Sequence, residues 1–288
     1  MSDPTRLAHA GPHLHEEPAN RRWRPSPIVL GVVAVAWVLA LVAEFTGAGD
    51  QLHHHELVGT SIPVGTALLL FLVAWQFHVA AMMLPASLPV IALFNRASAD
   101  QAHPHRVRAA FLGGYLVVWT AFGLAALLGD AALHAIEDRW QPLAENHHVV
   151  MGVVLVTAGA FQFSSLKDRC LDQCRHPVPF LLAHYRRGLA GAFDLGRRHG
   201  QFCVGCCWAL MLVMFAVGIA NLAWMAPLAL LMIYEKTAPG AERVVRPIGA
   251  ALIVLGAVVI ADPSWMPEFA GHDHGSPGDH SQHDHHDH

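Results

Sequence analysis

Charged side chains are scarce in this sequence: Asp, Glu, Lys and Arg together account for 14% of its 288 residues. The chain also lacks a Walker loop, a nucleophile elbow and the glycine pattern of a dinucleotide-binding fold, so ATP-driven pumping and hydrolysis have no support in it. No cleavable signal peptide precedes the first apolar segment. A basic domain for nucleic acid is absent as well. We therefore expect a protein that is not an enzyme and does not bind nucleic acid.

Long apolar runs, in contrast, dominate the chain, and hydrophobic residues make up 54% of it. A helix needs about 20 apolar residues to cross a hydrocarbon core about 30 Å thick. Several blocks approach or exceed that length, which predicts an all-α, polytopic transmembrane helix bundle in a lipid bilayer. The blocks cover residues 28–45, 62–84, 109–128, 148–163, 203–234 and 247–261.

The block at 203–234 is long enough for one tilted helix or for two short ones. Lys and Arg in short loops stay on the cytoplasmic side of a membrane, so the basic stretches that flank this block should share that side. We therefore expect a hairpin that turns near residues 218–221, and seven transmembrane helices with the N-terminus in and the C-terminus out. Arg139 is then the one residue among the 18 Lys and Arg that lies outside. The predicted location is a bacterial cytoplasmic (inner) membrane.

These features divide the chain into five parts. A polar cytoplasmic arm that bears histidines (1–27) precedes a four-helix transmembrane part (28–163). A cytoplasmic segment with cysteines (164–202) then leads to the helical hairpin and the last transmembrane helix (203–261). The final part (262–288) is rich in His and Asp, and its low complexity predicts disorder.

All five cysteines fall between positions 170 and 207, in two closely spaced groups. Their i, i+3 and i, i+4 spacings put the sulfurs of each group on one face if the segments are helical. Thiolates are soft donors that bind copper(I), zinc or iron–sulfur clusters, and neighbouring Lys and Arg residues favour the thiolate form. Packing and dithiol redox chemistry are the alternatives. The predicted metal ligands are Cys170, Cys174, Cys203, Cys206 and Cys207, with Met211 and Met214 continuing the sulfur-bearing stripe as copper(I) ligands.

The second apolar block holds a further candidate, the ionisable residue His78. At helical spacing it shares a face with Met82, which predicts a His/Met metal site towards the bundle interior. The alternative is a neutral histidine that hydrogen-bonds to a neighbouring helix. Pro85 should kink or end this helix. The Glu235–Lys236 pair is compatible with a simple pair at the membrane interface.

Four stretches occur together in the chain: "AAMMLPASLP", "QFSSLKDRCLDQCRHPVPF", "HGQFCVGCCWALM" and a later "EK". The combination resembles the pattern of a bacterial family of predicted metal-binding integral membrane proteins of unknown function. The resemblance implies a membrane protein that handles metal ions. It also implies that the five cysteines are family-pattern positions, together with Asn221, Trp224, Met225, Glu235 and Lys236.

The end of the chain reads "GHDHGSPGDHSQHDHHDH". Imidazole and carboxylate side chains bind zinc, copper(II), cobalt or nickel with little selectivity, and a flexible tail raises the local concentration of an ion. The histidines alternate with Asp, Ser and Gly, which favours a native metal-collecting tail over an expression tag. Its predicted ligands are His272, His274, His280, His283, His285, His286 and His288.

These observations favour a membrane protein that handles copper by binding, delivery or tolerance. A cytoplasmic-face cysteine cluster would hold the ion and the outer tail would gather it. Zinc or another divalent transition metal is the alternative cofactor. Two other functions remain open: an accessory or structural subunit of a membrane metalloenzyme complex, with other membrane subunits as partners, and a membrane dithiol oxidoreductase.

Overall fold

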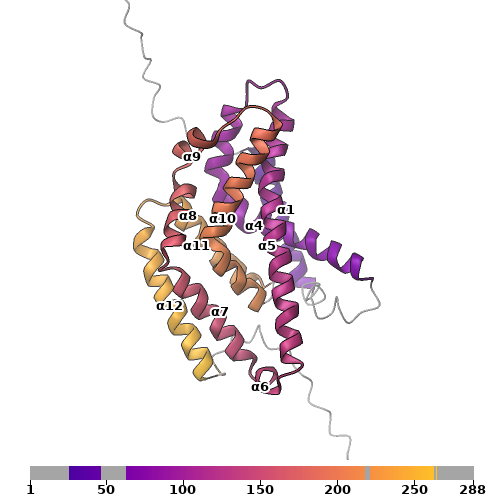
Figure 1. Ribbon diagram of the computed structural model, residues 1–288, viewed down its shortest axis with the longest axis vertical. Helices are drawn as coiled ribbons and strands as arrows, with labels where there is room; N and C mark the ends of the chain where they lie inside the picture. The colour runs from indigo at the N-terminus through magenta and orange to yellow at the C-terminus, as the bar shows by residue number, and fades with distance from the viewer. Residues whose placement is uncertain (1–25, 47–62, 218–220, 263, 265–288) are drawn as a thin grey trace, which may run out of the picture.

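The structure is a computed structural model, and it describes residues 26–46, 63–217, 221–262 and 264. Every long element in this part of the chain is an α-helix, so the predicted all-α class is confirmed (Figure 1). The helices are α1 (Pro27–Thr46), α4 (Val64–Ala97), α5 (Pro104–Glu137), α6 (Gln141–Ala144), α7 (His147–Phe161), α8 (Ser165–Arg175), α9 (Pro177–His184), α10 (Leu189–Val217), α11 (Leu222–Thr237) and α12 (Glu242–Ala261).

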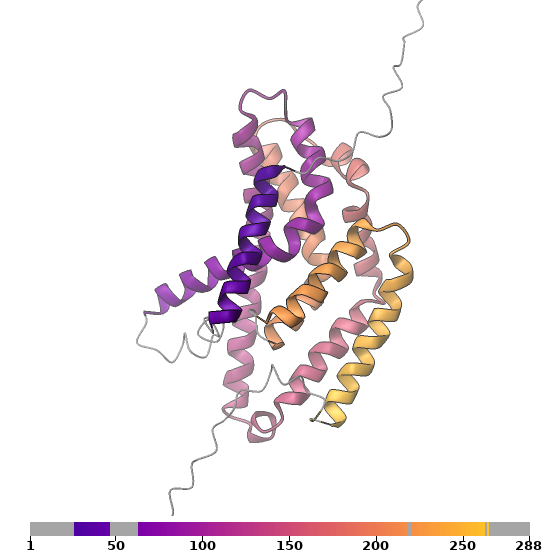
Figure 2. The same ribbon diagram turned by 180° about the vertical axis from the view of Figure 1, so that it is seen from behind.

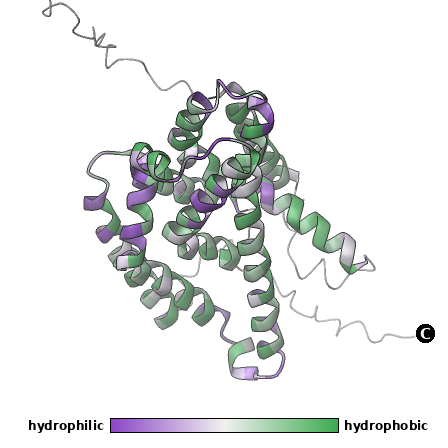
Figure 3. Cartoon of the chain, turned by 45° about the horizontal axis from the view of Figure 1, so that its top comes forward, coloured by the Kyte–Doolittle hydropathy of each residue, from purple (hydrophilic) through white to green (hydrophobic). Residues whose placement is uncertain are grey.

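Five of these helices, α1, α4, α5, α10 and α12, are long and apolar enough to cross a membrane. The pair α7 and α8, bent by 65° at a short break, would make a sixth span if the two are counted as one. Figure 3 shows hydrophobic colour along most of the long helices and hydrophilic residues mainly near their ends. These helices are compatible with a multi-pass membrane protein, while the count of seven helices and the orientation of the termini stay predictions.

The polar stretch at 164–202 is not a loop. It forms α8, α9 and the first half of α10, which begins at Leu189. Cys203 therefore lies in the middle of a long helix, and the expectation that the cysteines mark the start of a helix is wrong. The cause is close packing of α10 against α5, because a Cβ at Gly196 would overlap the Phe111 carbonyl oxygen.

The apolar block that begins at Cys203 is divided into two helices, as expected. α10 ends at Val217, α11 begins at Leu222, and residues 218–220 of the expected turn lie outside the described residues. The Asn221 side chain accepts a hydrogen bond from the Trp224 backbone N–H at 3.3 Å and so caps the N-terminus of α11.

The helices α7 and α12 lie side by side in both ribbon views (Figures 1 and 2). Glycines bring their backbones together: a Cβ at Gly159 would be 2.5 Å from the Gly249 carbonyl oxygen, and one at Gly256 would be 2.6 Å from the Gly152 carbonyl oxygen. Small residues at such positions allow the close approach that drives association of helices in lipid.

Helix α4 continues through both of its internal prolines, Pro85 and Pro89, and ends only at Ala97. Of the two outcomes expected at Pro85, a kink or a helix end, the end does not occur. Figures 1 and 2 show α4 changing direction along its length, with one part that stands away from the bundle and another inside it. The buried part carries "HVAAMML", residues 78–84, into the centre of the molecule.

Candidate functional site

Three cysteine side chains project from the middle of α10 into the bundle. Cys203, Cys206 and Cys207 are all fully buried, with exposed fractions of 0%, 1% and 1%. Their i, i+3 and i, i+4 spacings place them on one face of the helix, as the sequence predicts.

The cysteines of α8 approach the same place. The buried Cys174 side chain interacts with that of Cys206. Cys170 packs next to Gly205, where an added Cβ would be 2.6 Å from the Cys170 sulfur. The structure thus brings together the two groups of thiols that are separated in the sequence, and all five cysteines are free.

A lysine side chain from α11 lies among these sulfurs. The Lys236 ammonium donates a hydrogen bond to the Cys203 sulfur at 3.1 Å and lies 3.9 Å from the thioether sulfur of Met83 on α4. The Cys207 thiol contacts the same Met83 sulfur at 3.6 Å. We call these six residues the thiol–lysine cluster: Cys174, Cys203, Cys206, Cys207, Met83 and Lys236.

The fifth helix at the cluster, α5, contributes a tyrosine. The Tyr115 hydroxyl lies within hydrogen-bonding distance of the Cys203 sulfur, at 3.3 Å, and accepts a hydrogen bond from Ser87 at 3.3 Å. Cys203 therefore has two hydrogen-bonding neighbours at its sulfur, Tyr115 and Lys236. Such donors stabilise negative charge on a thiolate.

Glu235 and Lys236 do not form the simple interfacial pair that the sequence allowed. Both side chains are buried, with exposed fractions of 2% and 4%, and they point to different partners. Glu235 forms an ion pair with the fully buried Lys167 at 2.7 Å, and its backbone carbonyl accepts a hydrogen bond from Arg175 at 2.6 Å. Within the described residues no carboxylate forms an ion pair with Lys236.

The arginines near the thiols in sequence are engaged elsewhere. Arg197 and Arg198 both pair with Asp194, at 2.6 Å and 2.8 Å. The cation in contact with the cysteines is Lys236, which is 29 positions after Cys207 in the chain (236 minus 207). Sequence reasoning missed this contact because only the packing of α11 onto α4 and α10 creates it.

The other sequence-predicted ligands are more dispersed. The His78 ring stacks on Trp75 with centroids 5.6 Å apart, and its buried Nε2 has no hydrogen-bond partner among the described residues. Met82, Met211 and Met214 are fully buried in the core. The tail histidines and the rest of 265–288 lie outside the described residues.

The thiols do not form a ready coordination shell. Among the described residues, no group of three or more His, Cys, Asp or Glu side chains is arranged to hold a metal ion. Two contacts help to explain this, because the Cys206 and Cys207 thiols donate to the Cys203 backbone carbonyl at 3.1 Å and 2.8 Å. A metal ion at the cluster requires these side chains to rotate away from the helix backbone.

One buried residue beside the cluster was not anticipated. His199 lies one helical turn before Cys203, is 2% exposed, and has no hydrogen-bond partner at either ring nitrogen within the described residues. Its ring stacks on Tyr115 with centroids 5.6 Å apart. Buried polar groups without a partner are unusual. The i, i+4 spacing in "HGQFC" was the signal in the sequence that could have identified it.

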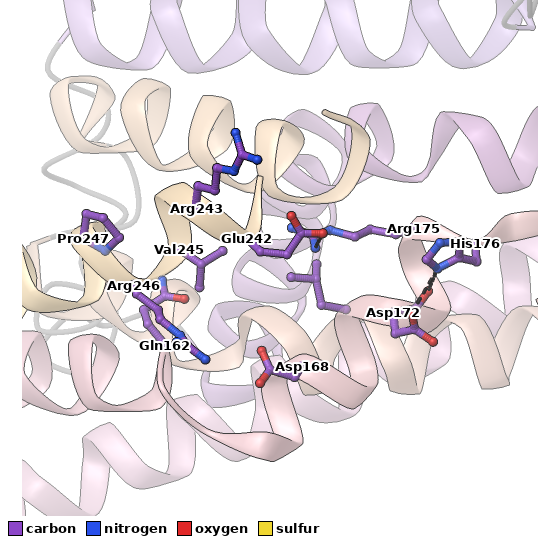
Figure 4. Close-up of a pocket in the computed structure, with 11 residues that line it drawn as sticks. Gln162, Asp168, Asp172, Arg175, His176, Glu242, Arg243, Val245, Arg246 and Pro247 are labelled. Carbon is purple, nitrogen blue, oxygen red and sulfur yellow. Dashed lines mark hydrogen bonds and ion pairs between the residues drawn. The ribbon is translucent and has the colours of Figure 1, made fainter. Parts of the chain in front are cut away.

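A polar cavity of about 720 Å³ lies between α8 and α12. Figure 4 shows charged side chains of both signs around it. Arg175 pairs there with Glu242 at 3.2 Å, and His176 pairs with Asp172 at 3.0 Å. Arg175 also bonds to the Glu235 carbonyl and so connects this cavity to the residue that precedes Lys236.

Comparison with known proteins identifies a family. The family model PpoB2, described as a copper chaperone, matches residues 72–259 of the 288. The matched region contains all six residues of the thiol–lysine cluster.

The chain was also compared with individual curated proteins and with solved structures. Decaprenyl-phosphate phosphoribosyltransferase from Mycolicibacterium smegmatis is 24% identical over 192 residues, which cover 64% of this chain and 56% of that protein. The chain thus spans little more than half the length of this relative. No solved structure matches the chain.

Proposed function

The chain belongs to the PpoB2 family of copper chaperones, and from this premise we propose that it is a multi-pass membrane protein that binds copper(I) at the thiol–lysine cluster and delivers it to a partner protein. The observation that carries the proposal is the convergence of four buried, free thiols and one thioether from three helices: α4, α8 and α10. In this proposal copper is the cargo, and the protein catalyses no covalent reaction.

The donor set favours copper(I) over zinc. Thiolate and thioether sulfurs are soft ligands that suit copper(I), whereas zinc is typically held by four tetrahedral ligands and rarely by methionine. The contact between Met83 and Cys207 puts a thioether beside the thiols. A binding step would turn Cys206 and Cys207 from the Cys203 carbonyl to the ion, and delivery would replace these thiolates one at a time with ligands of the partner.

The proposed topology places the cluster towards the cytoplasmic side and the histidine-rich tail outside. A contact between two arginine-bearing loops supports their placement on the same side of the membrane. The Tyr185 hydroxyl, next to Arg186 and Arg187, donates a hydrogen bond at 2.7 Å to the backbone carbonyl of Ala97, which is next to Arg96. In this arrangement the tail collects ions outside and the thiols hold copper inside. The client would be a copper-dependent membrane enzyme.

The binding site is tested on protein that lacks residues 271–288, so that tail histidines do not contribute copper. Cys203, Cys206 and Cys207 are changed together to Ser, and copper(I) is offered under reducing conditions against a competing copper(I) chelator. We expect about one copper per chain in the parent and almost none in the triple variant, because serine is a poor ligand for copper(I). Circular dichroism and gel filtration in detergent check the fold. Equal copper content in the two proteins contradicts the proposed site.

A further inference from the structure

We propose that Lys236 is the built-in counter-ion of the copper site: its ammonium stays among the sulfurs after copper(I) binds and limits the thiolate ligands to two. This inference rests on the proposed function. It adds a reason for the number of thiolates that bind the copper ion, namely the net charge of the buried site.

The Lys236 ammonium lies among the sulfur atoms of the cluster. Lys236 Nζ lies 3.1 Å from the Cys203 sulfur and 3.9 Å from the Met83 sulfur, and it interacts electrostatically with Cys174, Cys206 and Cys207. A lysine that only anchored α11 would need one partner. This one lies where four thiols from two other helices meet.

Among the described residues, Lys236 has no carboxylate as an ion-pair partner. The adjacent carboxylate, Glu235, is held by Lys167 at 2.7 Å. A buried ammonium without an anion is costly in free energy. Its nearest hydrogen-bond acceptor, at 3.1 Å, is the Cys203 sulfur, which carries a negative charge as a thiolate.

The charges of copper(I), two thiolates and the Lys236 ammonium add up to zero. Copper(I) carries one positive charge and two thiolates carry two negative ones, so their complex keeps one negative charge, which the Lys236 ammonium cancels. Each sulfur that binds as a thiolate releases its proton to solvent, and the lysine keeps its own. A third thiolate on copper(I), or a divalent ion with two thiolates, leaves a net charge in a buried site.

The arrangement therefore discriminates between ions by charge as well as by ligand softness. With Lys236 in place, copper(I) is neutralised by two thiolates, whereas a divalent ion such as zinc needs three. Without the ammonium, two thiolates balance a divalent ion and overcharge copper(I). Removal of the lysine charge should thus weaken copper(I) binding and shift the preference of the cluster towards zinc.

The test compares Lys236→Met with Lys236→Arg in protein without residues 271–288. Met keeps the length of the side chain and removes its charge, and Arg keeps the charge. We expect Lys236→Met to weaken copper(I) binding about tenfold or more, since the positive charge that balances the anionic copper(I)–dithiolate complex is lost, and to raise the ratio of zinc to copper affinity. Lys236→Arg should retain most of the copper(I) affinity. Affinity is measured by competition against chelators for copper(I) and for zinc.

The matched control is the double variant Lys167→Met/Glu235→Gln. It removes a second buried lysine charge together with the anion that pairs with it, and we expect the copper(I) affinity to stay near that of the parent. If this control weakens binding as much as Lys236→Met does, a general loss of buried charge explains the effect and the proposal is overturned.

A second measurement does not depend on the stability of a lysine variant. X-ray absorption of copper(I) in Met83→Leu protein, where the thioether sulfur is gone, counts the thiolate sulfurs directly. Two sulfurs support the proposal, and three overturn it.

Failure of the inference is distinguishable from failure of the proposed function. If copper(I) binding is unchanged in Lys236→Met but lost in the triple Cys→Ser protein, the counter-ion proposal is overturned and the proposed thiol site stands. If binding survives the triple Cys→Ser change, the proposed thiol site itself is overturned.

Discussion

At the scale of single residues, two neighbours in the sequence have different roles. Glu235 completes a buried ion pair with Lys167, and that pair fastens α8 to α11 beside the thiols. Lys236 points instead to sulfur atoms. The contrast follows from helix geometry, because consecutive residues project about 100° apart and so reach different neighbours.

The Lys167–Glu235 pair gives a prediction about stability. Lys167→Met leaves the Glu235 carboxylate buried without its cation, and we expect a loss of about 3–5 kcal/mol in the free energy of unfolding. Lys167→Met/Glu235→Gln should recover much of this loss, since no unpaired charge remains. Thermal unfolding in detergent, followed by circular dichroism, measures both. A single variant as stable as the parent would show that the pair contributes nothing.

At the scale of elements, glycine contacts decide how α10 lies on α5. A Cβ at Gly114 would overlap the Phe193 carbonyl oxygen and lie 2.8 Å from the Arg197 backbone nitrogen, while one at the adjacent Gly113 would meet nothing within 4 Å. This close approach holds Tyr115 at hydrogen-bonding distance from Cys203. The geometry of the site thus depends on residues that never touch it.

These adjacent glycines provide a matched pair of variants. Gly114→Ala forces α5 and α10 apart and should destabilise the protein by about 1–3 kcal/mol. Gly113→Ala meets no neighbour and should be neutral or stabilising by up to about 1 kcal/mol, because Ala favours the helix more than Gly does. The midpoint of thermal unfolding distinguishes the two. Equal midpoints would mean that α5 and α10 are not closely packed at Gly114.

At the scale of the whole molecule, four helices, α4, α8, α10 and α11, carry the thiol–lysine cluster, and α5 adds Tyr115 beside it. Two of these helices do not count as membrane spans on their own: α8 is short and polar, and α11 is short. Each of them brings one residue to the cluster, Cys174 from α8 and Lys236 from α11.

The proposed topology is open to a direct test. Seven crossings place the N-terminal arm in the cytoplasm and the tail after α12 outside, as the distribution of Lys and Arg indicates. A fluorescent protein that folds only in the cytoplasm should give signal when fused before residue 1 and none when fused after residue 288. A periplasmic phosphatase at the C-terminus should be active. Two termini on one side would require an even number of crossings.

Much of the fold follows from composition and pattern. The apolar runs predicted the helices, and charge placement predicted the division of the block that starts at Cys203. The pattern did not place the start of α10, because the polar segment before Cys203 is stabilised by contacts of Gly196 with α5 that no local pattern encodes. At Pro85 it left a kink and a helix end open, and the structure shows that α4 continues.

The sequence by itself determined that the chain is a multi-pass helical protein with thiols in two helical groups, since hydrophobicity and spacing are local properties. Only the tertiary structure decided which groups meet. Lys236 lies among the sulfurs and Met83 against Cys207 because α4 converges there with α10 and α11, which follow much later in the sequence. Packing thus brings the cysteines of "CLDQC" and "CVGCC" together, and the lysine beside them comes from a third segment.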